Sequence, residues 1–418
     1  MAAAVGETGS DPGRAFAVRL IAWQKTYGRH DLPWQYCRDA YRVWLAEIML
    51  QQTQVSTVIP YYRNFLSRFP SLDALAAAPL AGVLEVWAGL GYYARARNLH
   101  RCAQRVVAEH AGCFPPDVVD LARLPGIGRT TAGAIAVFAF GRRAAILDGN
   151  VKRVLGRHFA LEATASATHD EQRLWAFAES LLPTSDIEAY TQGLMDLGAT
   201  VCLRRAAQCA ICPLADGCLA YRSGRQNELP APRKRKPLPL RQVTLVLLSC
   251  AQGVLFERRP PAGIWGGLLS LPELGDRGLA DFAQRRNCSL LVTRQMPTTQ
   301  HAFTHFILNI DVVCAQGEPA GWRAAESTEV WLTYPEIVTA ALPAPIRQIL
   351  RAAISGGDQA VPVGGRSMRP IAHRPQATPP ASVTKPAAQP APPAPPQAST
   401  ANPKATGPSR PPAKPIDE

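Results

Sequence analysis

Four cysteines lie close together between residues 202 and 218. They are spaced C-x6-C-x2-C-x5-C, directly after a helical segment, and are Cys202, Cys209, Cys212 and Cys218. Four thiolates this near one another can surround one metal centre, and such sets bind either zinc or an iron–sulfur cluster. Zinc ribbons usually have two C-x2-C pairs, whereas only Cys209 and Cys212 form one here. The spacing therefore favours a [4Fe-4S] cluster over zinc, with buried thiols as the plain alternative.

Two acidic residues stand in different surroundings. Glu47 is the only charge in the apolar run WLAEIML, and burial raises the pKa of such a carboxyl toward neutrality, as a general acid requires. Asp148 lies in AAILDGNVKRV, at the start of a new helix, where backbone N–H groups are expected to keep it ionised. An acid and an anion together suit the cleavage of a glycosidic bond. The structural alternatives are an outward-facing Glu47 and a plain helix N-cap at Asp148.

Residues 117–140, DVVDLARLPGIGRTTAGAIAVFAF, predict a helix, a tight turn and a second helix. Gly126 and Gly128 are expected to turn the backbone with positive φ and to present N–H groups at the start of the second helix, where the dipole attracts an anion. The segment resembles the helix-hairpin-helix element that holds a DNA phosphate. An ordinary corner between two helices is the alternative.

Helical periodicity surrounds these motifs from about residue 14 to 222. Apolar residues recur at three- and four-residue spacing in segments such as FAVRLIAWQKTY, ARNLHRCAQRVVAEH and QRLWAFAESLL. Residues 223–240 combine prolines with a basic run and predict a linker. The β-rich runs QVTLVLLSC, FILNIDVVC and STEVWLTY, with helical patterns at GLADFAQRR and PAPIRQILRAAI, predict a small α+β domain over 241–354.

The protein is basic, with a formal net charge of +13 over 418 residues. Fifteen of its 38 prolines lie in 364–418, and we predict a disordered Pro/Ala-rich tail over 355–418. The tail accounts for only part of the charge, so the folded part is basic too, and basic proteins attract nucleic acid above other polyanions. No run of 18 apolar residues and no export signal are present, so we expect an intracellular, cytoplasmic protein without membrane partners, and a monomer by default.

In order along the chain, the motifs resemble the adenine DNA glycosylase (MutY) branch of the helix-hairpin-helix base-excision glycosylases, over about residues 16–350. The segments concerned, besides the four cysteines, are LPWQ, VWLAEIMLQQTQVSTVIPYY, GLGYYARARNL, LPGIGRTTAGAI, ILDGNVKRV and MDLGA. The resemblance implies a multidomain fold with an all-α helix-hairpin-helix glycosylase core at 14–222 and an α+β Nudix-like domain after it. The core would contain a six-helix barrel at about 35–142, with the hairpin at 124–129, and an iron–sulfur domain from 14–34 plus 143–222. A cleft between them would receive an extruded base.

The same resemblance implies roles for individual residues. Glu47 would protonate N7 of adenine and then help to activate water, while Asp148 would stabilise the sugar cation with Asn150 hydrogen-bonded beside it. Other side chains would line the adenine pocket or fill the gap that the extruded base leaves in the stack. The pocket residues would be Trp34 and Gln192, and the gap-filling residues Gln52 and Tyr92.

One position departs from a relative. The endonuclease III branch carries a nucleophilic lysine in the hairpin, where this sequence has Thr130. A hydroxyl cannot form a Schiff base with the sugar, so we predict a monofunctional glycosylase that uses water, and Thr130 keeps only a role in the substrate pocket.

The segments GVLFERRPPAGIWGGLLSLPE and HAFTHFILNIDVV resemble the C-terminal domain of the same family, which has a Nudix-like fold and recognises 8-oxoguanine opposite the adenine. A working Nudix hydrolase needs an acidic metal-binding run, whereas residues 281–286 read DFAQRR. We therefore predict a domain that recognises a base rather than a hydrolase. Its recognition loop would consist of Phe303, Thr304 and His305, with Thr304 in place of the family's serine.

The favoured interpretation is hydrolysis of the N-glycosidic bond of adenine mispaired with 8-oxoguanine or guanine in double-stranded DNA. An alternative of the same class is an endonuclease-III-like glycosylase and lyase on oxidised pyrimidines, which Thr130 and the additional domain disfavour. A different class is a non-catalytic iron–sulfur DNA-binding module, which would need neither Glu47 nor Asp148.

Overall fold

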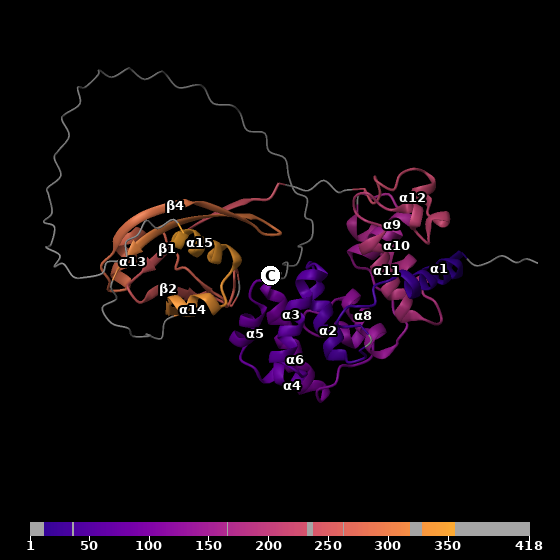
Figure 1. Cartoon of the computed structure of the whole chain (residues 1–418), viewed down its shortest axis with the longest axis horizontal. Coiled ribbons are helices and arrows are strands. Elements are labelled where there is room, and N and C mark those ends of the chain that lie inside the picture. Colours follow the sequence, from indigo (N-terminus) through magenta and orange to yellow (C-terminus); the bar gives the residue numbers. More distant parts are fainter. Residues whose placement is uncertain are drawn as a thin grey trace, which may run out of the picture. The chain divides into compact units, whose positions relative to one another are not determined.

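The computed structural model describes residues 12–355, except 36, 165, 232–236, 262 and 318–327. Helices form the N-terminal part, and a sheet with flanking helices forms the C-terminal part (Figure 1). The predicted fold class, an all-α glycosylase core followed by a Nudix-like domain, is confirmed. The predicted domain limits stay predictions, and the predicted tail lies, beyond its first residue, outside the described residues.

The helical part begins with α1 and ends with the short α12. Its helices are α1 (Pro12–Tyr27), α2 (Ala40–Leu50), α3 (Val55–Arg68), α4 (Leu72–Ala77), α5 (Leu80–Trp87), α6 (Tyr93–His110), α7 (Val118–Ala122), α8 (Arg129–Phe140), α9 (Gly149–His158), α10 (Ala167–Ser180), α11 (Ile187–Thr200) and α12 (Leu219–Arg222). Two 3-10 turns, η1 (Cys209–Ile211) and η2 (Ala215–Gly217), stand before α12.

These helices bury two separate groups of apolar side chains. Helices α2 to α8 share one core, in which Trp44, Trp87 and Leu99 are almost fully buried. Helices α1, α9 and α11 share a second core around Leu20 and Tyr190. The apolar faces that the periodicity predicts are therefore used to pack two groups of helices, and a site can form where the groups meet.

Side-chain caps place the starts of several helices. A carboxylate or hydroxyl oxygen accepts backbone N–H bonds of the first turn, which satisfies donors that the helix itself leaves unpaired. The capping residues are Asp39 for α2, Ser71 for α4, Asp117 for α7, Asp148 for α9 and Ser166 for α10. The cap at Asp39 begins the helix that contains Glu47, and the cap of α9 is the second predicted acid, Asp148 itself.

The C-terminal part is built on a mixed sheet with the strand order β3-β2-β1-β5-β4, and β6 also pairs with β2. Strands β1 and β5 run parallel, from the pair Leu240 and Ile307 to the pair Ser249 and Gln316, and the other neighbours are antiparallel. The elements are β1 (Leu240–Ser249), β2 (Gly253–Arg258), β3 (Leu269–Ser270), α13 (Gly278–Arg285), β4 (Leu291–Ala302), β5 (Ile307–Gln316), β6 (Glu329–Thr333), α14 (Tyr334–Thr339) and α15 (Ala344–Ser355).

Helices cover both faces of this sheet. Leu247 of β1 shares a core with Ile346 of α15, whereas its neighbour Val246, which points to the other face, shares a core with Phe282 of α13. Helices α13 and α15 lie at the two predicted helical patterns.

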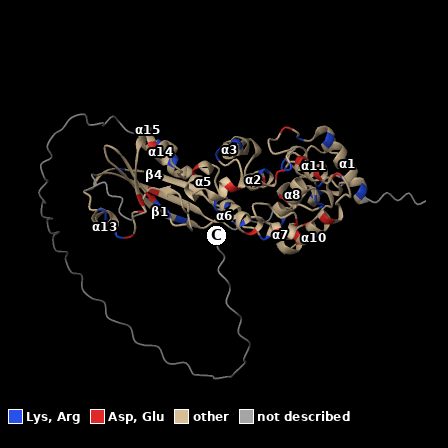
Figure 2. Cartoon of the chain, turned by 90° about the horizontal axis from the view of Figure 1, so that it is seen from below, with Lys and Arg blue, Asp and Glu red and all other residues tan. Residues whose placement is uncertain are grey.

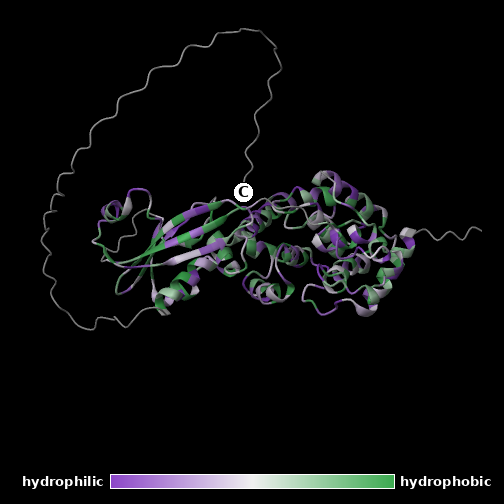
Figure 3. Cartoon of the chain, turned by 90° about the horizontal axis from the view of Figure 1, so that it is seen from above, coloured by the Kyte–Doolittle hydropathy of each residue, from purple (hydrophilic) through white to green (hydrophobic). Residues whose placement is uncertain are grey.

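Charged and hydrophobic residues are both spread over the described part of the chain. Lys and Arg are spread along the helices with acidic residues between them (Figure 2), and hydrophobic and hydrophilic residues alternate along helices and strands (Figure 3). No helix among the described residues is long and apolar enough to cross a membrane.

Candidate active site and metal centre

A cavity of about 730 Å³ lies between helices of the two cores. Ligand pockets typically have roughly 300–1,000 Å³, so the cavity can hold a nucleobase with part of its sugar. The structure brings Trp34, Glu47 and Gln192 together in its wall, as the sequence predicts. The lining residues are Gln24, Lys25, Arg29, His30, Leu32, Trp34, Gln35, Cys37, Arg38, Val43, Glu47, Leu50, Val55, Phe138, Glu188, Ala189, Gln192 and Met195.

Glu47 presents its carboxyl to this cavity from α2. Its helical neighbours Val43 and Leu50 also line the cavity and are apolar, so the carboxyl has lost most of its water. That desolvation, and secondly the charge of Asp148, raises the pKa of Glu47 to about 7. Glu47 is therefore a carboxylic acid that can hold or release a proton near neutral pH, as predicted.

Asp148 is the N-cap of α9. One carboxylate oxygen accepts the Val151 backbone N–H at 2.8 Å, and the other accepts the Asn150 side-chain amide at 3.3 Å. The predicted N–H donors are present and act to lower the pKa of Asp148, but burial has the larger effect, and the pKa is raised. Burial outweighs these donors because α9 and its neighbours exclude water from Asp148, and that Asp148 carries a negative charge stays a prediction.

The hairpin turn between α7 and α8 uses one glycine in the left-handed region. Gly126 has φ +77°, and a Cβ there would lie 2.8 Å from Cβ of Asn98. Gly128 has φ −88° and extended backbone, so its predicted positive φ is wrong, because a single left-handed residue completes the turn. A Cβ on Gly128 would meet open space, and no described side chain caps α8 there. The first N–H groups of α8 are thus open to an anion.

Gln52 and Tyr92 are exposed, and each has the left-handed backbone that is unusual for residues other than glycine, with φ +57° and +49°. Such conformations cost about 1–3 kcal/mol each and persist only when their surroundings hold them. Arg95 holds the backbone next to both residues. Its guanidinium donates to the Met49 carbonyl, near Gln52, at 2.8 Å and to the Gly91 carbonyl, next to Tyr92, at 3.2 Å. Nothing in the sequence distinguishes Arg95 from the other arginines of α6, so this role could not be predicted.

Thr130 lies in the first turn of α8 and is partly buried, outside the cavity wall. The neighbouring Thr131 is buried, and its hydroxyl accepts a hydrogen bond from the Gln51 side chain at 3.3 Å. The structure therefore does not place Thr130 among the residues that line the cavity.

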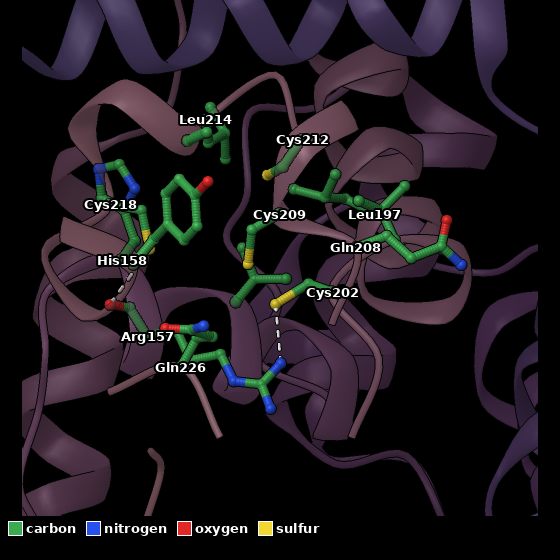
Figure 4. Close-up of a pocket in the computed structure, with 14 residues that line it drawn as sticks. Arg157, His158, Leu197, Cys202, Gln208, Cys209, Cys212, Leu214, Cys218 and Gln226 are labelled. Atoms are coloured by element: carbon green, nitrogen blue, oxygen red, sulfur yellow. Dashed lines mark hydrogen bonds between the residues drawn. The ribbon is translucent and has the colours of Figure 1, made fainter. Parts of the chain in front are cut away.

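The four cysteines line one apolar cavity, and their sulfur atoms face a shared space (Figure 4). Arg157 donates to Sγ of Cys202 at 3.3 Å, and its backbone carbonyl accepts from Sγ of Cys218 at 3.6 Å. Burial raises the pKa of Cys212 to about 12, and the backbone hydrogen bond at Leu214 opposes this only in part. Four converging thiols in apolar surroundings fit a cofactor whose positive centre stabilises thiolates. Within the described residues, no three His, Cys, Asp or Glu side chains are placed to hold a single metal ion.

The predicted recognition loop is the turn between β4 and β5. The Phe303 ring stacks on Phe306 with a centroid distance of 4.6 Å, whereas Thr304 and His305 are exposed at the tip. In α13 the one acidic residue, Asp281, accepts a hydrogen bond from Arg285 Nε at 2.8 Å. That carboxylate is thus already paired with a cation.

Two family models match the chain. Residues 45–180 match the HhH-GPD superfamily of base excision DNA repair proteins, and residues 243–352 match the NUDIX domain. The chain is 33% identical over 337 residues to an adenine DNA glycosylase of Buchnera aphidicola subsp. Baizongia pistaciae, covering 80% of this chain and 95% of that protein. It is 34% identical to an adenine DNA glycosylase of Homo sapiens, covering 81% of this chain and 73% of that protein. A solved thermostable thymine-DNA glycosylase matches 50% of this chain and 97% of its own with 28% identity and a TM-score of 0.46.

The helical fold with its hairpin, together with the match to the HhH-GPD family model, identifies a DNA glycosylase of the helix-hairpin-helix superfamily, a hydrolase of base excision repair. The two relatives that match 80% and 81% of this chain are both adenine DNA glycosylases. The chain belongs to the adenine DNA glycosylase family.

Proposed function

We propose that this enzyme hydrolyses the bond between adenine and deoxyribose where the adenine is mispaired with 8-oxoguanine or guanine in duplex DNA, and that it acts as a monomer. The observation that carries the proposal is Glu47, an acid with a pKa of about 7 in the wall of a cavity large enough for a base. Asp148 lies near enough for its charge to act on Glu47. A binding module would have no need of this pair.

In the proposed mechanism, the neutral Glu47 gives its proton to N7 of an adenine seated in the cavity. The glycosidic bond then breaks, and its electron pair leaves with the base. Asp148, oriented by the Asn150 amide, stabilises the positive charge that develops on the sugar. The Glu47 carboxylate next accepts a proton from the water that attacks the sugar carbon, which restores the acid. Trp34 and Gln192 hold the base, while Gln52 and Tyr92 occupy the gap in the duplex.

Two further features support DNA as the substrate. The open N-terminus of α8 after Gly126 and Gly128 suits a backbone phosphate. The exposed tip of the β4–β5 turn, with Thr304 and His305, suits recognition of the opposite base. Because adenine is an undamaged base, selectivity has to come from the base opposite it.

The opposite base provides the direct test. We expect rapid excision of adenine opposite 8-oxoguanine and opposite guanine, and little excision opposite thymine, when single-turnover rates are measured on otherwise identical duplexes. Equal rates opposite all three bases would contradict the proposed selectivity. Activity on oxidised pyrimidines, with none on adenine, would favour the endonuclease-III-like alternative.

The four cysteines are proposed to hold a [4Fe-4S] cluster, which supplies an anchor for the surrounding loops when bound. We expect the purified protein to absorb light at about 400 nm and to contain iron rather than zinc. Cys212→Ser should lose this absorbance, whereas Cys113→Ser, at an exposed cysteine elsewhere, should keep it. Zinc without iron would contradict the proposed cluster.

A monofunctional mechanism predicts weak covalent trapping. With Thr130 in the hairpin, borohydride reduction during turnover is expected to give little enzyme–DNA adduct, because no amine attacks the sugar. Lys152, whose ammonium group pairs with Glu171 at 2.7 Å, is the candidate for any weak adduct. An efficient adduct that survives Lys152→Ala would contradict this prediction.

A further inference from the structure

The Gln192 side chain is held in one orientation by a buried carboxylate. Gln192 is 9% exposed in the cavity wall, and its amide nitrogen donates to an oxygen of Asp196 at 2.8 Å. Asp196 lies one turn further along α11 and is completely buried. It does not line the cavity itself, so it acts on a bound base only through its neighbours.

Two more donors converge on the same carboxylate. Arg29, from the segment after α1, donates its backbone N–H to one oxygen at 2.9 Å and its Nε–H to the other at 2.7 Å. Both oxygens of Asp196 thus accept N–H groups from Arg29, and the part of a glutamine amide that can donate to such an oxygen is its NH2 group. The Gln192 NH2 must therefore face Asp196. Its carbonyl oxygen is then the other arm of the same amide, on a side chain that lines the cavity.

We infer that Asp196, together with Arg29, is a positioning residue that sets the specificity for adenine by fixing the Gln192 carbonyl as a hydrogen-bond acceptor in the cavity. The inference rests on the proposed function, in which adenine occupies this cavity. The amino group at C6 of adenine can donate to such an acceptor. A purine with an oxygen at C6 would place two acceptors against each other, and an unsatisfied buried polar group of this kind costs about 10- to 100-fold in rate.

The substitution Asp196→Asn tests this inference, because the asparagine amide can also donate a hydrogen bond and so allows the Gln192 amide to rotate by about 180°. Full-length wild type and Asp196→Asn are compared in single-turnover excision of adenine, hypoxanthine and unsubstituted purine, each opposite 8-oxoguanine. We expect the adenine-to-hypoxanthine rate ratio to fall about tenfold or more. Purine has no group at C6, so its rate should change little.

The purine rate separates positioning from a general structural role. Equal losses for all three bases, or an unchanged ratio, would overturn the inference. Should Asp196→Asn be unstable because Arg29 is left unpaired, the double variant Arg29→Gln with Asp196→Asn removes both charges and should show the same fall in ratio. Glu109→Gln is the control, because it removes an exposed carboxylate paired with Arg105 on α6, away from the cavity, and should leave the ratio unchanged. Failure of wild type to excise adenine at all would instead contradict the proposed function.

Discussion

Glu47→Gln is expected to lower the rate of adenine excision by about 100- to 10,000-fold, the usual contribution of a positioned general acid. Glutamine has nearly the same shape but no proton to donate to N7. The single-turnover rate on an 8-oxoguanine:adenine duplex measures the effect, and duplex binding should be retained. Glu85→Gln, an exposed position on α5, is the matched control and should be fully active. Equal activity of Glu47→Gln and wild type would remove the general-acid assignment.

The wild-type rate should depend on pH in the sense that the raised pKa of Glu47 requires. Glu47 donates only while protonated, so the rate should be highest below about pH 7 and fall roughly tenfold per pH unit above it. At low pH the rate should fall again as Asp148, whose pKa is also raised, loses its charge. A profile that stays flat between pH 6 and pH 9 would contradict the Glu47 assignment, and the absence of a fall at low pH would contradict the role of the Asp148 charge.

Loss of activity in Glu47→Gln should not come from loss of the fold. The folded protein retains the Glu47 proton up to about pH 7, whereas the unfolded chain releases it near 4.5, so the folded state binds more protons between these values. The stability due to neutral Glu47 is therefore complete below pH 4.5 and is lost as pH rises through 7. The Glu47→Gln variant has no such group to ionise. Its free energy of unfolding at alkaline pH should therefore exceed that of the wild-type protein by up to about 3 kcal/mol. Denaturant unfolding at two pH values measures the difference.

A pair of substitutions at Asp148 should separate its charge from its capping role. Asp148→Asn keeps a good N-cap for α9 but removes the negative charge, and we expect the excision rate to fall about 100- to 1,000-fold with little change in stability. Asp148→Ala should lose the same activity and also about 1 kcal/mol of unfolding free energy, because the Val151 N–H loses its acceptor.

The capping position of α10 offers a comparison for this pair. Ser166→Ala removes a side-chain cap of the same kind from His169 N–H, away from the cavity, and should lower stability without lowering the excision rate. Full activity in Asp148→Asn would mean that Asp148 is a cap alone.

Much of the site follows from residues that are close in sequence. The apolar surroundings of Glu47, the N-cap at Asp148 and the turn at Gly126 each depend on a few neighbouring positions, and the structure contains all three. The predicted positive φ at Gly128 was wrong because the type of residue shows only which backbone angles are allowed.

Contacts between distant residues had no signal in the sequence. Arg29 and Asp196 are 167 positions apart, and their partly buried ion pair exists only because α1 and α11 pack in one core. Arg95 donates to the Met49 carbonyl at the end of α2, 46 positions away in the sequence, and so joins two separate segments of the backbone.

The helices, the α+β domain, the cysteine spacing and the apolar surroundings of Glu47 could all be predicted from residue order, since hydrophobic periodicity and capping act within one or two turns. Packing between distant segments sets which side chains share the cavity, makes burial raise the pKa of Asp148, and sets which way the Gln192 amide faces. Those properties depend on the water that packing removes and on the partners that it brings together, and neither can be derived from the order of residues in a single segment.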